Sequence, residues 1–218
     1  MRRPQARPVR LRRHWDKSAR SYDRVMGFWD RRVFRDTRAW ICGQATGDTL
    51  EVAVGTGLNL SCYPDTVRLT GVDFSPAMLA IARRRAADLG LAADLRDGDA
   101  QQLDFPDESF DTVVCTFSLC TIPDVDRAVG EMRRVLRPGG RLLLADHIVS
   151  STWYLRAVQR LVELASIPAG GEHYRRRPLR TVQSAGFDVQ RRDRFGPGGI
   201  VERLTARKPE TPRPPPPA

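Results

Sequence analysis

Four short apolar runs constrain the fold of this chain more than any other feature of its sequence. They are Thr49–Val54, Val67–Asp73, Thr112–Phe117 and Arg141–Val149. Near-continuous apolar runs of this length predict strands that are covered on both faces, as in a parallel sheet. Helical patterns separate the runs, so the sequence predicts a doubly wound, mostly parallel α/β sheet with helices on both faces.

Helix signals and a hairpin complete this alternation. Ser75 followed by Pro76 provides a helix cap and a first-turn proline. Apolar residues recur at helical spacing from Val125 to Leu136, and the sequence RPGG then stops the pattern. Two strand-like segments, FDVQRRDRF and GIVERLTARK, are joined by GPG, which predicts an antiparallel hairpin at one edge of the sheet.

The sequence EVAVGTGLNL predicts a strand that ends in a glycine turn. A dinucleotide fingerprint requires a small residue where Leu60 stands, and a phosphate loop requires Gly-Lys-Ser/Thr, which is absent. Gly55 and Gly57 still allow a ligand to approach the backbone closely. Such sheets bind ligands at the carboxyl ends of their strands, so strand-end residues become the candidates. These are residues 51–57, Asp73, Asp99 and residues 117–121.

The net charge of +10 is concentrated at the two ends of the chain. Residues 1–20 carry eight basic side chains and one acidic one, and residues 203–218 carry four and one. The 24 basic and 24 acidic side chains of residues 21–202 cancel. Because proteins that read a duplex usually carry a basic stripe on their folded surface, this distribution argues against nucleic acid as a partner.

The composition of the ends also sets the expected domain boundaries. Residues 1–13 predict a basic flexible arm, residues 14–208 one domain, and residues 209–218 a proline-rich tail. No apolar run reaches the roughly 18 residues of a membrane span, and the basic N-terminus lacks the apolar stretch of a secretory signal. We therefore expect a cytoplasmic protein.

The four cysteines predict neither a metal site nor a disulfide framework. They show no CxxC pairing and have no histidine at ligand spacing. We expect reduced, mostly buried thiols. The cysteines are Cys42, Cys62, Cys115 and Cys120.

Two acids follow strand signals. Asp73 lies 22 residues after Glu51, where a carboxylate can accept both hydroxyls of a ribose, a signal that also fits a nicotinamide oxidoreductase. Asp99, in the sequence GDA, can accept an adenine amino hydrogen while the backbone N–H of Ala100 meets a ring nitrogen. The second acid separates this chain from the nicotinamide enzymes.

In this order and spacing, the motifs resemble those of class I S-adenosylmethionine-dependent methyltransferases. The chain is similar to a small single-domain group that includes ubiquinone/menaquinone-pathway enzymes and, more closely, phospholipid N-methyltransferases and their thiol-methylating relatives. The sequences GTGLNLSCYP, LTGVDFSPAML and LRPGGRLLLADHI carry the closer match, which covers roughly residues 14 to 207. The resemblance implies seven strands in the order 3-2-1-4-5-7-6, with strand 7 antiparallel.

The resemblance implies that S-adenosylmethionine binds around the glycine turn. Gly55 and Gly57 would let the backbone approach its methionine part, and Glu51 would support the loop or receive the amino group. The family's first glycine is Ala53 here, and its methyl group is expected to be tolerated because the strand is still extended. Three more residues are implied on the methionine side, although Tyr22 fits packing equally well. They are Tyr22, Phe117 and Ser118.

The resemblance assigns the adenosine part of the cofactor to the next two strand ends. Asp73 would hold the ribose hydroxyls, with Phe74 and Met78 on either side of adenine. Asp99 and Ala100 would read the edge of the base.

The acceptor side is less defined. His147, at the end of LLLADH, is a candidate general base, or a histidine that is simply hydrogen-bonded at a strand end. His173 and Tyr174 are expected to contact or cover the substrate, and His14 to belong to a lid. The acceptor is a small molecule that presents N, O, S or activated C.

Alternative functions remain open at this stage. A peripheral phospholipid N-methyltransferase would contact anionic lipid weakly through the basic N-terminus. A non-catalytic module would bind the cofactor without turnover. Residues 116–124, TFSLCTIPD, lack the Asn/Asp-Pro-Pro-aromatic run of many enzymes that methylate exocyclic amines, which argues against methylation of DNA or RNA bases. The oligomeric state is left open.

Overall fold

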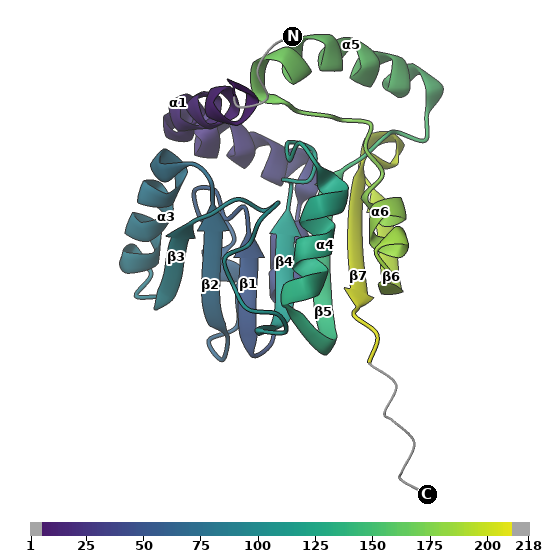
Figure 1. Ribbon diagram of the computed structural model, residues 1–218. Helices are drawn as coiled ribbons and strands as arrows, with labels where there is room; N and C mark the ends of the chain where they lie inside the picture. The colour runs from purple at the N-terminus through teal and green to yellow at the C-terminus, as the bar shows by residue number, and fades with distance from the viewer. Residues whose placement is uncertain (1–5, 211–218) are drawn as a thin grey trace, which may run out of the picture.

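The strands of the structure form one sheet in the order β3-β2-β1-β4-β5-β7-β6 (Figure 1). The computed structural model describes residues 6–210. Its strands are β1 (Asp48–Val52), β2 (Arg68–Asp73), β3 (Ala93–Asp97), β4 (Phe110–Thr116), β5 (Leu136–His147), β6 (Asp188–Phe195) and β7 (Val201–Arg207). β7 is antiparallel to β5 and β6, and the other pairs are parallel. The predicted sheet, its order and its hairpin are confirmed.

Helices cover both faces of the sheet and its upper edge (Figure 1). They are α1 (Ala6–Trp29), α2 (Thr37–Cys42), α3 (Pro76–Asp88), α4 (Val125–Val135), α5 (Trp153–Gly170) and α6 (Pro178–Ser184), with short turns η1 (Asp30–Phe34), η2 (Leu60–Cys62) and η3 (Pro197–Gly199). α3 begins as predicted: Ser75 Oγ accepts a hydrogen bond from the backbone N–H of Met78, and Pro76 lies in the first turn.

The central strands are covered on both faces, as their apolar runs predict. Val113 and Leu142 pack in one hydrophobic cluster with Met132 of α4. Val114 and Leu143, the next residue in each strand, pack in a second cluster that includes residues of α2 and α3. Because successive side chains of a strand point to opposite faces, β4 and β5 contribute to two cores.

The N-terminal segment is helical from Ala6, which corrects part of the flexible arm expected over residues 1–13. Residues 1–5 lie outside the described part of the chain, as do residues 211–218 of the expected tail. α1 lies against α3 at the carboxyl edge of the parallel strands (Figure 1).

Polar contacts hold much of α1 in place. Arg12 forms an ion pair with Asp97 at the end of β3. Asp16 accepts a hydrogen bond from Ser75 Oγ at 2.5 Å, just before α3. Asp23 pairs with Arg85 of α3. A search for apolar stripes in the sequence does not detect a helix that is anchored by such polar contacts. For this reason the sequence predicted a flexible arm over residues 1–13, where α1 begins.

Glu51 is a buried acid in the middle of the sheet. It lies in β1 and accepts hydrogen bonds from Asn59 Nδ2 at 2.7 Å and from the Tyr63 hydroxyl at 2.9 Å. Burial raises the pKa of Glu51 from 4.5 to about 7, although both hydrogen bonds act in the opposite direction. Ionisation of Glu51 therefore costs free energy in the folded state.

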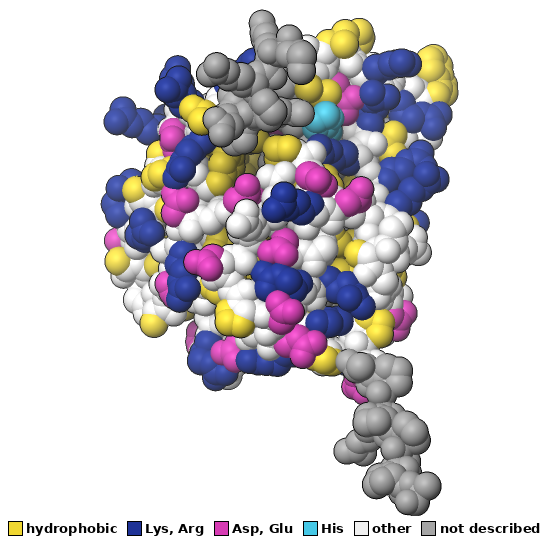
Figure 2. All heavy atoms as spheres, in the orientation of Figure 1, with side chains coloured by type: hydrophobic (Ala, Val, Ile, Leu, Met, Phe, Trp, Pro, Cys, Tyr) yellow, Lys and Arg dark blue, Asp and Glu magenta, His cyan; other side chains and the backbone are white. Residues whose placement is uncertain are grey.

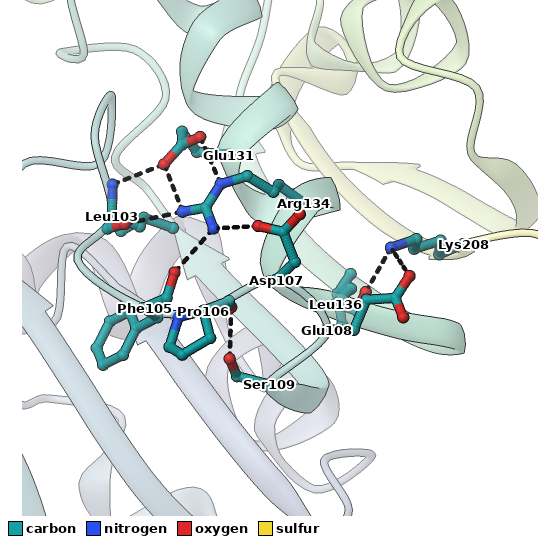
Figure 3. Close-up of polar contacts among 10 residues, drawn as sticks. All are labelled: Leu103, Phe105, Pro106, Asp107, Glu108, Ser109, Glu131, Arg134, Leu136 and Lys208. Atoms are coloured by element: carbon teal, nitrogen blue, oxygen red, sulfur yellow. Dashed lines mark hydrogen bonds and ion pairs between the residues drawn. The ribbon is translucent and has the colours of Figure 1, made fainter.

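Arg134 of α4 ties the segment between β3 and β4 to that helix (Figure 3). Its guanidinium donates to the carboxylates of Glu131 and Asp107. It also donates to the backbone carbonyls of Leu103 and Phe105, each at 2.8 Å. A single side chain thus fixes a long connection that has little regular structure.

We expect Glu51→Gln to reduce the pH dependence of the free energy of unfolding. A group with a raised folded-state pKa contributes stability that is complete below pH 4.5 and is lost as the pH rises through about 7. The loss in the native protein should exceed that in the variant by roughly 3 kcal/mol. Urea unfolding between pH 5 and pH 8 measures it.

The exposed acid Asp88 at the end of α3 provides the control for this measurement. Asp88→Asn should keep the native pH profile. Equal profiles for the native protein and Glu51→Gln would contradict a buried ionisation at this position.

We expect Arg134→Met to lower the free energy of unfolding by about 1–3 kcal/mol, because two backbone carbonyls and two carboxylates lose their donor. Arg127→Met, at an exposed position of the same helix, should stay within about 0.5 kcal/mol of the native protein. Urea unfolding at pH 7 compares the two variants. Equal losses would show that Arg134 does not hold the segment.

Candidate functional site

A small pocket opens at the carboxyl ends of β1, β2 and β4, where the sequence places the cofactor site. Most of the predicted cofactor residues line it, together with Thr121, from the candidate segment 117–121, and Trp15, which the sequence analysis missed. The lining consists of Trp15, Tyr22, Ala53, Gly55, Asp73, Phe74, Met78, Phe117, Ser118 and Thr121. The geometry therefore brings together side chains from α1, α3 and three strand ends.

The glycine turn departs from its predicted conformation at Ala53. β1 ends at Val52, and Ala53 has a left-handed φ of 58°. The expectation of an extended strand at this position is wrong. A left-handed backbone costs a residue with a Cβ about 1 kcal/mol or more, so Ala53 is a strained substitute for glycine.

The two glycines of the turn serve different purposes. Gly55 has a φ of 58°, and a Cβ built there meets nothing within 4 Å, so the space beside its backbone is open to a ligand. A Cβ on Gly57 would lie 2.7 Å from Leu60 and 3.3 Å from Ala82. Gly57 is therefore needed for close packing against α3 and does not line the pocket, and its predicted contact with the cofactor stays a prediction.

Asp73 connects the turn to the end of β2. Its side chain is buried, with Oδ2 accepting the backbone N–H of Gly55 and Oδ1 that of Ser75, each at 2.8 Å. Burial raises the pKa of Asp73 to about 6, and these two hydrogen bonds oppose the rise. Each carboxylate oxygen can accept a second hydrogen bond, so Asp73 can still bind a ligand hydroxyl.

Besides Gly57, three predicted cofactor residues are not part of the pocket lining. Glu51 accepts hydrogen bonds from Asn59 and Tyr63. Of its two predicted roles, support of the loop and binding of the amino group, these contacts favour support of the loop. Asp99 and Ala100 lie beyond the end of β3. Asp99 is exposed and accepts the backbone N–H of Gln101 at 2.8 Å, because the chain turns there.

α1 closes the pocket from above. Trp15 and Tyr22 belong to this helix, and the Tyr22 hydroxyl is buried, which raises its pKa. The Trp15 Nε1 hydrogen is buried and has no hydrogen-bond acceptor among the described residues. The remaining cavity is about 40 Å³, room for a few water molecules. A nucleoside is larger, so the pocket must widen to admit one.

Arg38 of α2 lies behind the pocket wall and was not identified from the sequence. Its guanidinium carbon lies 5.0 Å from the centre of the Phe117 ring. It pairs with Asp30 and donates to Asn59 Oδ1 at 2.9 Å. Its Nη2 is buried without an acceptor among the described residues, so a donor remains for an anionic ligand group.

His147 stands at the end of β5 with one ring nitrogen near Asp146 and the other without a partner among the described residues. Its Nδ1 lies 3.3 Å from Asp146 Oδ1, and its ring centre lies 4.7 Å from that of Tyr174. Nε2 is buried and has no partner among residues 6–210. His147 does not line the small pocket. It lies near Cys120, which stands in the chain between the pocket residues Ser118 and Thr121.

The other predicted substrate residues lie near this histidine or above it. His173 donates its backbone N–H to the Cys120 carbonyl, and the Tyr174 hydroxyl donates to Glu172 at 2.8 Å. His14 lies against Gly170 at the end of α5, so it connects the two helices at the upper edge. These contacts are compatible with a cover over the acceptor, and the roles of the three residues stay predictions.

Cys120, Asp146 and His147 place three potential metal-ligand atoms within 4.8 Å of one another. Both Asp146 oxygens already accept backbone N–H groups, from His147 at 2.8 Å and from Cys120 at 3.2 Å. Burial also raises the pKa of the Cys120 thiol, which disfavours the thiolate that binds metals. We interpret the cluster as hydrogen-bonded support for His147. The expected absence of a metal stays a prediction.

A larger depression, of about 430 Å³, lies between the start of α4 and the start of α6. Its lining includes Asp124, Asp126, Arg176 and Arg177, so its charges are mixed. Leu119, from the candidate segment 117–121, lines it, but none of the residues assigned to the cofactor or the acceptor does. The smaller pocket, at the strand ends, is the one that most of the predicted cofactor residues line.

Comparisons with known proteins agree with this geometry. Residues 50–144 match a family model described as a methyltransferase domain. Over 116 residues the chain is 47% identical to the phosphatidylethanolamine N-methyltransferase of Cereibacter sphaeroides, covering 52% of this chain and 57% of that protein. Over 115 residues it is 40% identical to the demethylmenaquinone methyltransferase of Deinococcus radiodurans, covering 51% and 48%. The chain spans about half the length of these relatives.

Solved structures share the fold. A phosphoethanolamine N-methyltransferase of Haemonchus contortus, in complex with S-adenosyl-L-methionine, has a TM-score of 0.69 at 17% identity, covering 89% of this chain and 57% of that one. A SAM-dependent methyltransferase of Methanosarcina mazei has a TM-score of 0.63 at 22% identity, covering 77% and 95%. Residues 50–144 thus match the model of a methyltransferase domain, and the chain shares the fold of these solved structures.

Proposed function

We propose that the chain is an S-adenosylmethionine-dependent methyltransferase that acts on a small-molecule acceptor by in-line methyl transfer. The observation that carries the proposal is the pocket beside Asp73 and the open backbone of Gly55, within the segment that matches the methyltransferase domain. No other cavity described here combines strand ends, a glycine turn and a buried carboxylate.

The residues around the pocket fit the chemistry of this cofactor. Asp73 has lone pairs left for the ribose hydroxyls, and Phe74 and Met78 offer apolar surface for adenine. The unpaired donors Trp15 Nε1 and Arg38 Nη2 suit a carboxylate such as that of the methionine part. Asp99 and Ala100 stay predicted contacts to the base, which the closed pocket does not reach.

When bound, the cofactor supplies a methyl group that is already activated by its sulfonium. The task of the protein is then to orient the acceptor and to exclude water, and alignment of this kind can contribute several kcal/mol. α1 excludes water because Trp15 and Tyr22 close the pocket. A hydroxyl acceptor must also lose a proton. The buried Nε2 of His147 can accept it, while Asp146 orients the ring through Nδ1.

A phospholipid N-methyltransferase is the second candidate. The similarity over half of the chain to a phosphatidylethanolamine N-methyltransferase favours it. An amine acceptor needs no base beyond ambient pH, so this candidate assigns His147 a binding role. The non-catalytic alternative predicts cofactor binding without turnover.

We expect Asp73→Ala to weaken the binding of S-adenosylhomocysteine by at least a hundredfold. The variant loses hydrogen bonds from two ribose hydroxyls to a charged acceptor, each worth about 1.5–3 kcal/mol, as well as the link to Gly55. Titration calorimetry measures the affinity, and circular dichroism verifies the fold. Asp94→Ala, at an exposed acid of β3, is the control and should bind as the native protein does. An unchanged affinity of Asp73→Ala would overturn the site assignment.

We expect His147→Ala to reduce kcat by tenfold or more when the acceptor is a hydroxyl, and to leave it nearly unchanged for a thiol. The reason is that only the hydroxyl needs a general base at neutral pH. Steady-state rates with matched hydroxyl, amine and thiol acceptors measure the difference. A uniform loss across all three acceptors would indicate that His147 supports the structure and is not a base.

A further inference from the structure

α5 presents its apolar side to solvent. The side chains of Trp153, Leu161 and Leu164 are 74%, 67% and 72% exposed, and Tyr154 and Val158 are more than half exposed. At about 100° per residue, ten of the apolar or small residues fill one continuous half of the helix, and Leu155 and Ile167 lie on the other half. That half consists of Trp153, Leu164, Ala157, Pro168, Leu161, Tyr154, Ala165, Val158, Ala169 and Val162. We call it the apolar face of α5.

The side of α5 that faces the protein combines two partly buried apolar residues, Leu155 and Ile167, with polar contacts. Gln159 Nε2 donates to the carbonyls of Ile148 and Tyr174, at 2.8 and 3.1 Å. Glu163 is buried and pairs with Arg175, whose backbone N–H it also accepts at 2.9 Å. Surface helices normally bury their apolar stripe, so this helix is held in reversed orientation by polar contacts. A large exposed apolar surface of this kind indicates a binding partner.

The charges of α5 identify the kind of partner. Arg156 and Arg160 are exposed and lie along one edge of the apolar face, whereas the single acid of the helix, Glu163, is buried in its ion pair. In Figure 2, hydrophobic side chains lie at the upper edge of the molecule, in the region of α5, with Lys and Arg side chains beside them. Apolar and cationic groups therefore share one surface.

We propose that the apolar face of α5 docks in the interface of an anionic lipid bilayer, with Arg156 and Arg160 on the phosphates. Amphipathic helices with basic edges lie in the interfacial plane in this way, and Trp153 and Tyr154 suit that depth. Among the described helices, none has the length and apolar character needed to cross a bilayer. A second copy of α5 could cover the apolar face, but it offers no free acid to the two arginines.

Docking through α5 would bring the proposed acceptor site to the membrane. α5 lies over the carboxyl edge of the sheet, it contacts His14 of α1 through Gly170, and Gln159 bonds the backbone of Tyr174 beside His147 (Figure 1). Resting on the proposed methyltransferase function, this arrangement specifies the acceptor class as an amphiphile that is taken from the bilayer.

Vesicle co-sedimentation tests the docking independently of catalysis. The native protein is expected to bind vesicles made of an equal mixture of phosphatidylglycerol and phosphatidylcholine. This binding should be weaker in 0.5 M NaCl than in 0.1 M NaCl. The double variant Leu161→Glu/Leu164→Glu should bind at least tenfold more weakly. Arg156→Gln/Arg160→Gln should lose about thirtyfold on anionic vesicles, because each basic residue near such a surface contributes about 1 kcal/mol. Leu89→Glu, at the exposed residue that follows α3, is the control and should bind normally.

Cofactor affinity, measured by calorimetry, should be unchanged in these variants, so failure of docking and failure of the methyltransferase proposal are distinguishable. Absence of vesicle binding by the native protein would overturn the docking proposal. Binding that survives Leu161→Glu/Leu164→Glu would also overturn it and would point to the basic N-terminus. The native protein could instead self-associate without binding vesicles, and the double variant could abolish that self-association. This outcome would overturn the docking proposal and identify a second copy of the chain as the partner.

Discussion

The hydrogen bond from the backbone N–H of Gly55 to Asp73 is the interaction on which the site depends. It joins the turn after β1 to the end of β2, and the other oxygen of the same carboxylate positions Ser75, the cap of α3. The cost is a carboxylate held away from water, which is visible in its raised pKa. Turn, strand end and helix start are thus placed by one side chain, and the open backbone of Gly55 faces the space that they enclose.

The sequence was informative wherever a feature depends on local pattern. Apolar runs and helix caps predicted the sheet and α3, and the motif order led to the pocket. The pattern could not show the left-handed φ of Ala53, because residue type alone does not reveal backbone conformation at a non-glycine position. Trp15 and Arg38 were missed because their contacts join segments far apart in the chain. The predicted contact of Asp99 with the base stays a prediction, because Asp99 lies in a turn outside the pocket lining.

α1 and α5 share a principle that periodicity cannot detect. Both helices are placed by polar and ionic contacts: Asp16 and Asp23 fix α1, and Gln159 and Glu163 fix α5. The Asp23–Arg85 pair of α1 is partly exposed and contributes about 1 kcal/mol or less, whereas loss of a partner from the buried Glu163 of α5 costs more. Of the two helices over the site, α5 therefore has the more strongly held polar contact.

The outward orientation of the apolar face of α5 affects how fast the protein could attach to a bilayer and leave it. Many interfacial segments are unstructured in solution and lose conformational entropy when they fold on a bilayer. α5 is already helical and already holds its apolar residues outward. Its attachment would require no ordering step, so arrival and departure would be limited by diffusion and by the modest area of one helix. Such a contact favours reversible binding with a short lifetime on the membrane over permanent attachment.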